Sequence, residues 1–337
     1  MDARPSPQPH EFRDQEDTML DQGKIAEILQ AARDKAETIL DLRDKARAQR
    51  AQALEANQKK MALQIRLAAP GVESAATVET AGFLAAAGDS WFDYPLHDVL
   101  KLLDDRYGYN VESSAHKGDP IEKMAYPGGQ MEDFARKLDK IKDRGAVPKA
   151  VLVSGGGDDV AGKEFGMLLN NAFSRIAGWD AEVVDGVVNV RIKTAYLDML
   201  MTITHMCESR FDGKLIPILV HGYDYPVPDG RGFLGGWPFP GPWLDPGFRE
   251  KNFPNDSPAD LQKRIAMMKN TMDQFNTMVG SLPSQPELAH VHYIDLRGTL
   301  STQLSDYKDW WANELHPTEQ GFNKVTDKFA AVLAKLP

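Results

Sequence analysis

From about residue 76 onward, short apolar runs alternate with longer amphipathic segments, and this alternation allows only a small group of folds. The apolar runs are AGFLAAAG, YNVESSA, KAVLVSGGG, KLIPILVHG and HVHYIDL. Helical patterns lie between them at about 95–107, 130–144, 191–210 and 258–281, with a last helix after His316. Strands and helices that alternate in this way predict a three-layer α/β/α sandwich with a mainly parallel sheet.

The first seventy residues have a different character. Residues 1–20 are polar and rich in proline, and we expect them to be disordered. Over 21–70, good helix formers predominate, and apolar residues recur every three or four positions, which predicts a helical extension with one apolar face. That face comprises Ile25, Ile28, Leu29, Ala32, Ala36 and Ile39. We expect the extension to pack on the main domain, 76–337, or to bind a protein partner or a second copy.

Charge and composition exclude several classes of partner. The net charge is −10; residues 1–70 hold equal numbers of acidic and basic side chains, so the excess acid belongs to the main domain. An acidic domain with no basic stripe argues against nucleic acid as a partner. No apolar run approaches the roughly 18 residues of a transmembrane helix. A single cysteine, Cys207, and the lack of a signal-peptide pattern favour the cytoplasm, with export without a cleaved signal as the alternative. No Cys/His cluster has metal-ligand spacing, and we expect neither metal nor cofactor.

An unusual motif follows each expected strand or lies near its end. In chain order these motifs are Gly-Asp-Ser at 88–90, His-Lys-Gly-Asp at 116–119, Gly-Gly-Gly-Asp-Asp at 155–159, His-Gly-Tyr-Asp at 221–224, and Asn-Glu-Leu-His-Pro at 313–317. Because ligands bind beyond the carboxyl ends of parallel strands, these motifs are expected to meet at one edge of the sheet. Five such motifs at one edge predict a functional site there.

In their order, these motifs resemble the GDSL, or SGNH, hydrolases over about residues 80–335. That resemblance implies a flavodoxin-like sheet and a serine esterase or lipase. It also implies that Ser90 is the nucleophile, that His316 is the catalytic histidine, and that Gly118, Gly157 and Asp158 form the oxyanion and substrate-binding region. The chain departs from the family pattern at Asp158, where the family has asparagine.

The chemistry of a serine nucleophile explains these residue types. A serine hydroxyl becomes reactive when a histidine removes its proton, and backbone amides then stabilise the negative oxygen of the ester carbonyl. The histidine needs a partner at its other ring nitrogen. Asn313 stands where the family has aspartate, three residues before His316. Glu314, Asp309 or a backbone carbonyl are the alternatives for this third position, and Asn313 is the one we expect.

A loop at 222–248 holds seven glycines, six prolines and seven aromatic residues in 27 positions, which excludes regular structure. Long irregular loops are usually functional, and we expect an aromatic wall beside the serine, with a self-packed structural loop as the alternative. The aromatic residues considered for this wall are Tyr223, Tyr225, Phe233, Trp237, Phe239 and Trp243, with Trp91, Phe92, Trp310 and Trp311 close by. The resulting hypothesis is a hydrolase of hydrophobic acyl or lipid esters. The alternatives are a carbohydrate O-acetyl esterase and a catalytically impaired binding protein.

Overall fold

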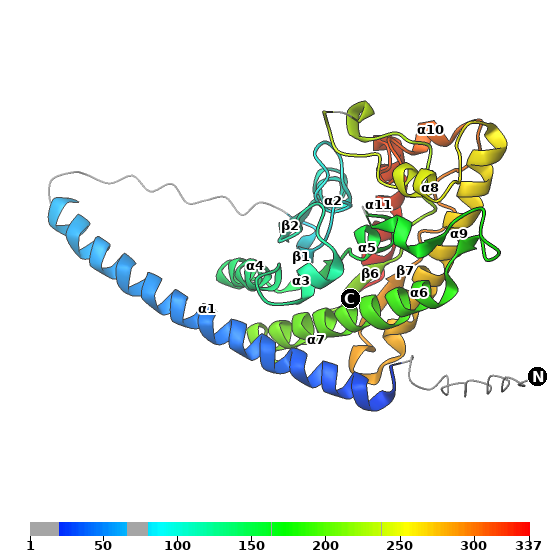
Figure 1. The fold of residues 1–337 in the computed structure, drawn as a ribbon. Helices are drawn as coiled ribbons and strands as arrows, with labels where there is room; N and C mark the ends of the chain where they lie inside the picture. The colour runs from blue at the N-terminus through cyan, green and yellow to red at the C-terminus, as the bar shows by residue number, and fades with distance from the viewer. Residues whose placement is uncertain (1–19, 66–79, 163, 237) are drawn as a thin grey trace, which may run out of the picture.

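A computed structural model describes residues 20–65, 80–162, 164–236 and 238–337 of the chain. Residues 1–19 of the segment expected to be disordered (1–20), the predicted boundary near Pro70 and the whole of Trp237 lie outside the described residues. α1 (Gln22–Ile65) is a single long helix, and the sheet domain follows it (Figure 1).

The centre of the molecule is a five-stranded sheet in which every neighbouring pair of strands is parallel. Its strands are β1 (Gly82–Ala87), β2 (Tyr109–Ser113), β3 (Pro148–Val153), β6 (Ile218–His221) and β7 (Val291–Ile294). Their order is β2-β1-β3-β6-β7, which is the flavodoxin-like order. The predicted α/β/α sandwich with a parallel sheet is therefore confirmed.

Helices cover both faces of the sheet. α2 (Val99–Tyr107) and α11 (Glu319–Leu333) pack together on one face, while α4 (Met131–Asp143), α7 (Lys193–Arg210) and α9 (Pro258–Ser281) cover the other. The shorter helices are α3 (Ile121–Ala125), α5 (Gly157–Ala161), α6 (Ala181–Asp185), α8 (Asp245–Glu250) and α10 (Tyr307–Trp310). A π-helical segment, Gly186–Ile192, leads into α7, and β4 (Leu169–Asn170) pairs antiparallel with β5 (Gly178–Trp179).

Helix α7 is apolar around most of its circumference, which is typical of a helix buried on all sides. The sheet covers one side of α7, and α1 covers the other (Figure 1). The predicted apolar stripe of α1 is buried in this contact, except that Ile28 is only partly covered. Arg43 of α1 and Arg210 of α7 both bind Asp139 of α4, at 2.6 and 3.1 Å. α1 is thus an integral layer of the molecule over its described side chains.

The strand order reverses between β1 and β3, because β2 lies on one side of β1 and the later strands lie on the other. In parallel sheets the crevice at such a reversal is where ligands bind. Ser90 follows β1 and the 155–159 motif follows β3, so both lie at this point. Ser90 itself lies in a turn, closed by a hydrogen bond from Phe92 N to Asp89 O (3.1 Å).

Candidate active site

Ser90 and His316 are in direct contact, although 226 residues separate them along the chain. The Ser90 Oγ lies 2.8 Å from the His316 Nε2. The His316 side chain is buried, and burial lowers its pKa from 6.5 to about 3. The imidazole is therefore neutral across the physiological range and is able to accept a proton from the serine hydroxyl.

Asn313 holds the other side of the His316 ring. Its Oδ1 lies 3.0 Å from the ring Nδ1 and also accepts the backbone N–H groups of Leu315 (3.0 Å) and His316 (2.9 Å). Because those two backbone groups are always donors, the amide oxygen and not the amide nitrogen must face the ring. Nδ1 therefore carries the proton, and Nε2 is left free to accept one from Ser90. Asn313 thus fixes the tautomer that a general base requires, without contributing a charge.

Tyr94 contacts both Asn313 and His316, although the sequence analysis did not single it out. Its hydroxyl accepts a hydrogen bond from Asn313 Nδ2 at 3.0 Å, and its ring stacks on His316 with 4.4 Å between centroids. Burial raises the pKa of Tyr94 to about 12, so the hydroxyl stays neutral. Trp243 meets the His316 ring edge-on, with 5.5 Å between centroids. The histidine is thus held between two aromatic rings.

The other two candidates for the third position have different surroundings. Glu314 is fully buried, but its carboxylate accepts backbone N–H groups of the 222–248 loop. The donors, at 2.6 to 3.0 Å, are Gly230, Trp243, Leu244 and Asp245. Burial raises the pKa of Glu314 to about 7. Asp309 is exposed on α10. Of the three carboxyl and amide side chains considered, Asn313 is the one beside the ring.

The expected oxyanion donors are close to Ser90. Gly118 lines a cavity together with Ser90 and His316, and its φ of 79° is one that favours glycine. Within the described part of the chain, the N–H groups of Ser90 and Gly118 donate to no other protein atom. Gly157 lines a second cavity with Ser90, and a Cβ there would meet the Tyr223 ring at 2.9 Å. Backbone donors therefore remain available at this edge.

Asp158 lines both cavities, and its Oδ2 is buried without a hydrogen-bond partner in the described structure. Burial raises the pKa of Asp158 to about 7, and the neighbouring Asp89, Asp159 and Asp119 raise it further. Burial likewise raises the pKa of Asp159 to about 6. Four carboxyl groups gathered here disfavour the ionised form of Asp158. At mildly acidic pH, Asp158 is therefore neutral and able to donate a hydrogen bond, as the asparagine of the GDSL/SGNH pattern would be.

A buried network beneath Ser90 fixes its turn. Asp89 accepts the Ser154 hydroxyl at 2.6 Å, the backbone N–H of Trp91 at 3.0 Å, and the Tyr223 hydroxyl. Gln130 binds both backbone groups of Gly88, at 2.7 and 2.9 Å. A Cβ on Gly88 would lie 2.8 Å from the Phe92 ring, so glycine is required there. Sequence reasoning missed this network, because its long-range partners lie 42 to 134 residues apart or carry no motif of their own.

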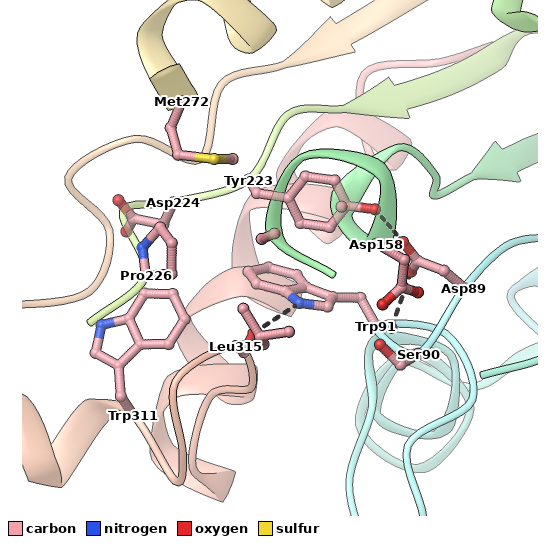
Figure 2. Close-up of a pocket in the computed structure, with 12 residues that line it drawn as sticks. Asp89, Ser90, Trp91, Asp158, Tyr223, Asp224, Pro226, Met272, Trp311 and Leu315 are labelled. Atoms are coloured by element: carbon pink, nitrogen blue, oxygen red, sulfur yellow. Dashed lines mark hydrogen bonds between the residues drawn. The ribbon is translucent and has the colours of Figure 1, made fainter. Parts of the chain in front are cut away.

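Two cavities meet at Ser90. The larger has a volume of about 390 Å³ and is lined by Tyr94, Pro95, Lys117, Gly118, Phe233, Phe239, Pro240, Trp243 and His316, besides Ser90 and Asp158. The smaller, of about 30 Å³, runs from Ser90 and Asp158 along the Trp91 ring to Pro226, Met272 and Trp311 (Figure 2). Three aromatic residues of the 222–248 loop, Phe233, Phe239 and Trp243, thus line the larger cavity. A fourth, Tyr223, lines the smaller one.

Three residues considered with the wall, Phe92, Tyr225 and Trp310, line neither cavity. Tyr225 binds Asp273 and Lys269 of α9 through its hydroxyl, at 2.7 and 3.1 Å, and lines neither cavity. Phe92 packs in the core against Phe329. The histidine of the fourth motif, His221, is fully buried among aromatic rings, and burial lowers its pKa. It is a core residue.

No protein-family model matches the sequence, and no curated protein matches it. Several solved structures are similar to it. A lipase from a goat rumen metagenome is 13% identical over 74% of this chain and 97% of its own, with a TM-score of 0.45. A catalytic mutant of an acetylxylan esterase from Geobacillus stearothermophilus is 14% identical over 77% and 96%, with a TM-score of 0.39.

A member of the lipolytic G-D-S-L family from Veillonella parvula is 8% identical over 75% of this chain and 99% of its own, with a TM-score of 0.39. At these identities the similarity concerns the fold alone. The order of the parallel strands and the position of the motifs near their carboxyl ends agree with the predicted resemblance to the GDSL/SGNH hydrolases.

Proposed function

We propose that the protein is a serine ester hydrolase, with Ser90 as nucleophile and His316 as general base. The observation that carries the proposal is the continuous chain of contacts from Ser90 Oγ through the His316 ring to Asn313 Oδ1, at 2.8 and 3.0 Å. Nucleophile, base and orienting group within hydrogen-bond reach of one another are the arrangement that activates a serine.

The reaction follows from this geometry. Ser90 Oγ forms a bond to the ester carbonyl carbon as its proton passes to His316 Nε2, and the carbonyl electron pair moves onto oxygen. When the C=O bond re-forms, the bond to the alcohol oxygen breaks, and that oxygen takes the proton from His316. A water molecule then attacks the acyl-Ser90 ester by the same steps, and the acid and free serine result.

The negative oxygen formed in each step is stabilised by the N–H groups of Ser90 and Gly118, with Gly157 at the adjoining helix start as a further donor. A donor of this kind typically contributes about 2.7–4 kcal/mol. Asp158 acts here in its neutral form by donating its O–H. Its ionised form repels the developing charge, so Asp158 links the activity to pH.

The large cavity favours an ester with a bulky apolar group, since aromatic rings and prolines form most of its lining. Such esters include the hydrophobic acyl and lipid esters expected from the sequence. An acetyl ester of a carbohydrate is the alternative, because sugar rings also stack on aromatic side chains.

A binding protein that has lost catalysis is the competing function. It is favoured by the neutral Asn313 and by the lowered pKa of His316, since no carboxylate among the described residues stands beside the ring to stabilise its protonated form.

Covalent labelling with a fluorophosphonate, followed by mass spectrometry, separates the two functions. We expect one adduct on Ser90, and none in Ser90→Ala or His316→Ala. Hydrolysis of 1-naphthyl acetate should be lost in both variants, and the double variant should be no worse than either, because members of one catalytic unit are not additive. Absence of labelling in the folded wild-type protein would favour the binding protein.

A further inference from the structure

The two cavities at Ser90 differ in size by more than tenfold, about 30 against 390 Å³, and only Ser90 and Asp158 line both. An ester has two substituents on its carbonyl carbon, the acyl chain and the alcohol. When Ser90 attacks, these two groups must point in different directions, so each is expected to occupy a different cavity.

His316 determines which group goes where. The histidine must give its proton to the departing alcohol oxygen, so the alcohol has to lie on the side of His316 Nε2. His316 lines the large cavity and does not line the small one. We propose that the large cavity receives the alcohol and that the small cavity receives the acyl group, which it limits to acetyl or propionyl. This proposal rests on the proposed function.

The size of the small cavity sets this limit. A group the size of a water molecule or a methyl group needs about 10–15 Å³ of cavity volume. A cavity of about 30 Å³ therefore accepts about two carbons of the acyl chain beyond the carbonyl carbon. Its walls are rigid, because Trp91 and Trp311 are buried edge-to-face and Trp91 Nε1 donates to Leu315 O at 3.1 Å. Tyr223 is fixed by Asp89 and Ser154. Met272 of α9 is the flexible side chain in the lining.

Charge restricts the acyl group as well. Asp89, Asp158 and Asp224 line the small cavity, and its exposed lining is mainly apolar. Among its twelve lining residues, all of which the structure describes, none is a lysine or an arginine. An acyl group with its own carboxylate, such as succinyl, would therefore be repelled. The substrate class is then a short, uncharged acyl ester of a bulky apolar alcohol, and the long hydrophobic acyl esters considered above are excluded.

Two ester series test the proposal in the full-length protein. The first keeps 1-naphthol as the alcohol and varies the acyl group through acetate, propionate, butyrate and hexanoate. We expect kcat/KM to fall at least tenfold between propionate and butyrate. The second keeps the acetyl group and varies the alcohol, and we expect 1-naphthyl acetate to exceed phenyl acetate at least threefold, a comparison that keeps both alcohols aromatic.

Substitutions in the lining of the small cavity test whether this cavity limits the length of the acyl group. Met272→Ala should raise the ratio of butyrate to acetate hydrolysis at least fivefold, whereas Met268→Ala, equally buried one turn earlier on α9 and outside both linings, should leave it unchanged. Ala161→Val, in the same small cavity, should act in the opposite direction and reduce propionate relative to acetate. Thermal unfolding of each variant shows that it is folded.

The outcomes separate this proposal from the proposed function. Hydrolysis that depends on Ser90 but proceeds equally well with acetate and hexanoate overturns the assignment of the small cavity and leaves the esterase intact. A change of acyl preference in Trp243→Ala, with none in Met272→Ala or Ala161→Val, reverses the assignment of the two cavities. Failure of the wild-type protein to hydrolyse any ester or to label at Ser90 overturns the proposed function itself.

Discussion

At the scale of single residues, Asn313 has a neutral amide at the position where the GDSL/SGNH pattern has the charged carboxylate of an aspartate. The Asn313 Nδ2 donates to the Tyr94 hydroxyl, and that hydroxyl is equally able to donate to a carboxylate. Asn313→Asp is therefore accommodated without a clash. The new charge stabilises the protonated His316 ring and raises its pKa. We expect kcat for 1-naphthyl acetate at pH 8 to rise roughly tenfold or more. The variant keeps the His316 tautomer with its proton on Nδ1, and its carboxylate stabilises the positive charge that forms on the ring during the reaction.

The pH profile provides a second readout of this variant. In the wild type the acid limb should lie near pH 3, where His316 becomes protonated. In Asn313→Asp it should move upward by at least one pH unit. Tyr94→Phe serves as the control, since it removes the hydroxyl and leaves Asn313 in place, so its acid limb should not rise. An unchanged or lower kcat in Asn313→Asp would show that the neutral amide is the better partner.

We expect Asp158 to determine the alkaline limb of the pH profile. Its pKa is raised to about 7, so the neutral donor form is present at lower pH and is lost as pH rises through that value. We expect wild-type kcat/KM to fall roughly tenfold per pH unit above pH 7. Asp158→Asn should remove this decline, because the amide donates at every pH. An alkaline limb that persists in Asp158→Asn would exclude Asp158 as its source.

At the scale of structural elements, Glu314 fixes the 222–248 loop through four backbone N–H groups. Glu314→Ala leaves these donors without their partner, and each buried donor left unpaired costs about 1–3 kcal/mol. We expect the free energy of unfolding, measured in urea, to fall by about 3 kcal/mol or more. Asp309→Ala, at an exposed position in the neighbouring α10, should change it little.

Activity measurements on Glu314→Ala and Asp309→Ala test how the 222–248 loop contributes to the large cavity. Phe233 and Trp243, which line the large cavity, lie within the loop. Loss of Glu314 should therefore weaken selection for the alcohol group along with stability. If Glu314→Ala lowered kcat with no change in stability, Glu314 would belong to the catalytic unit and not to the loop.

These elements also show what a sequence can reveal. The strands and helices follow from local periodicity, and the order of motifs placed Ser90, Gly118 and His316 at one edge. By contrast, Glu314 and Tyr94 act through partners 69 to 219 residues away. No local pattern distinguishes a glutamate that binds a loop from one that orients a histidine, so the sequence favoured Asn313 for the third position without excluding Glu314 or Asp309.

At the scale of the whole molecule, α1 covers the side of α7 that faces away from the sheet. Ala36 is fully buried in this layer, and we expect Ala36→Glu to lower the free energy of unfolding by more than about 3 kcal/mol, because an unpaired charge enters an apolar interface. Thr38→Glu is the matched control, since Thr38 is exposed two residues later. Urea unfolding of both variants, with 1-naphthyl acetate hydrolysis of the folded fraction, measures the effect. Equal stability of the two variants would mean that α1 contributes little to the fold.

The contact between α1 and α7 has a consequence for how the chain is made. Asp44 and Arg210, which bind each other across it, are 166 residues apart. At about 5–20 residues per second, the ribosome takes roughly 10 to 30 s to make that intervening chain. During this interval the apolar stripe of α1 has no α7 to cover it. The apolar stripe of α1 therefore stays uncovered by its final partner until α7 itself has been made.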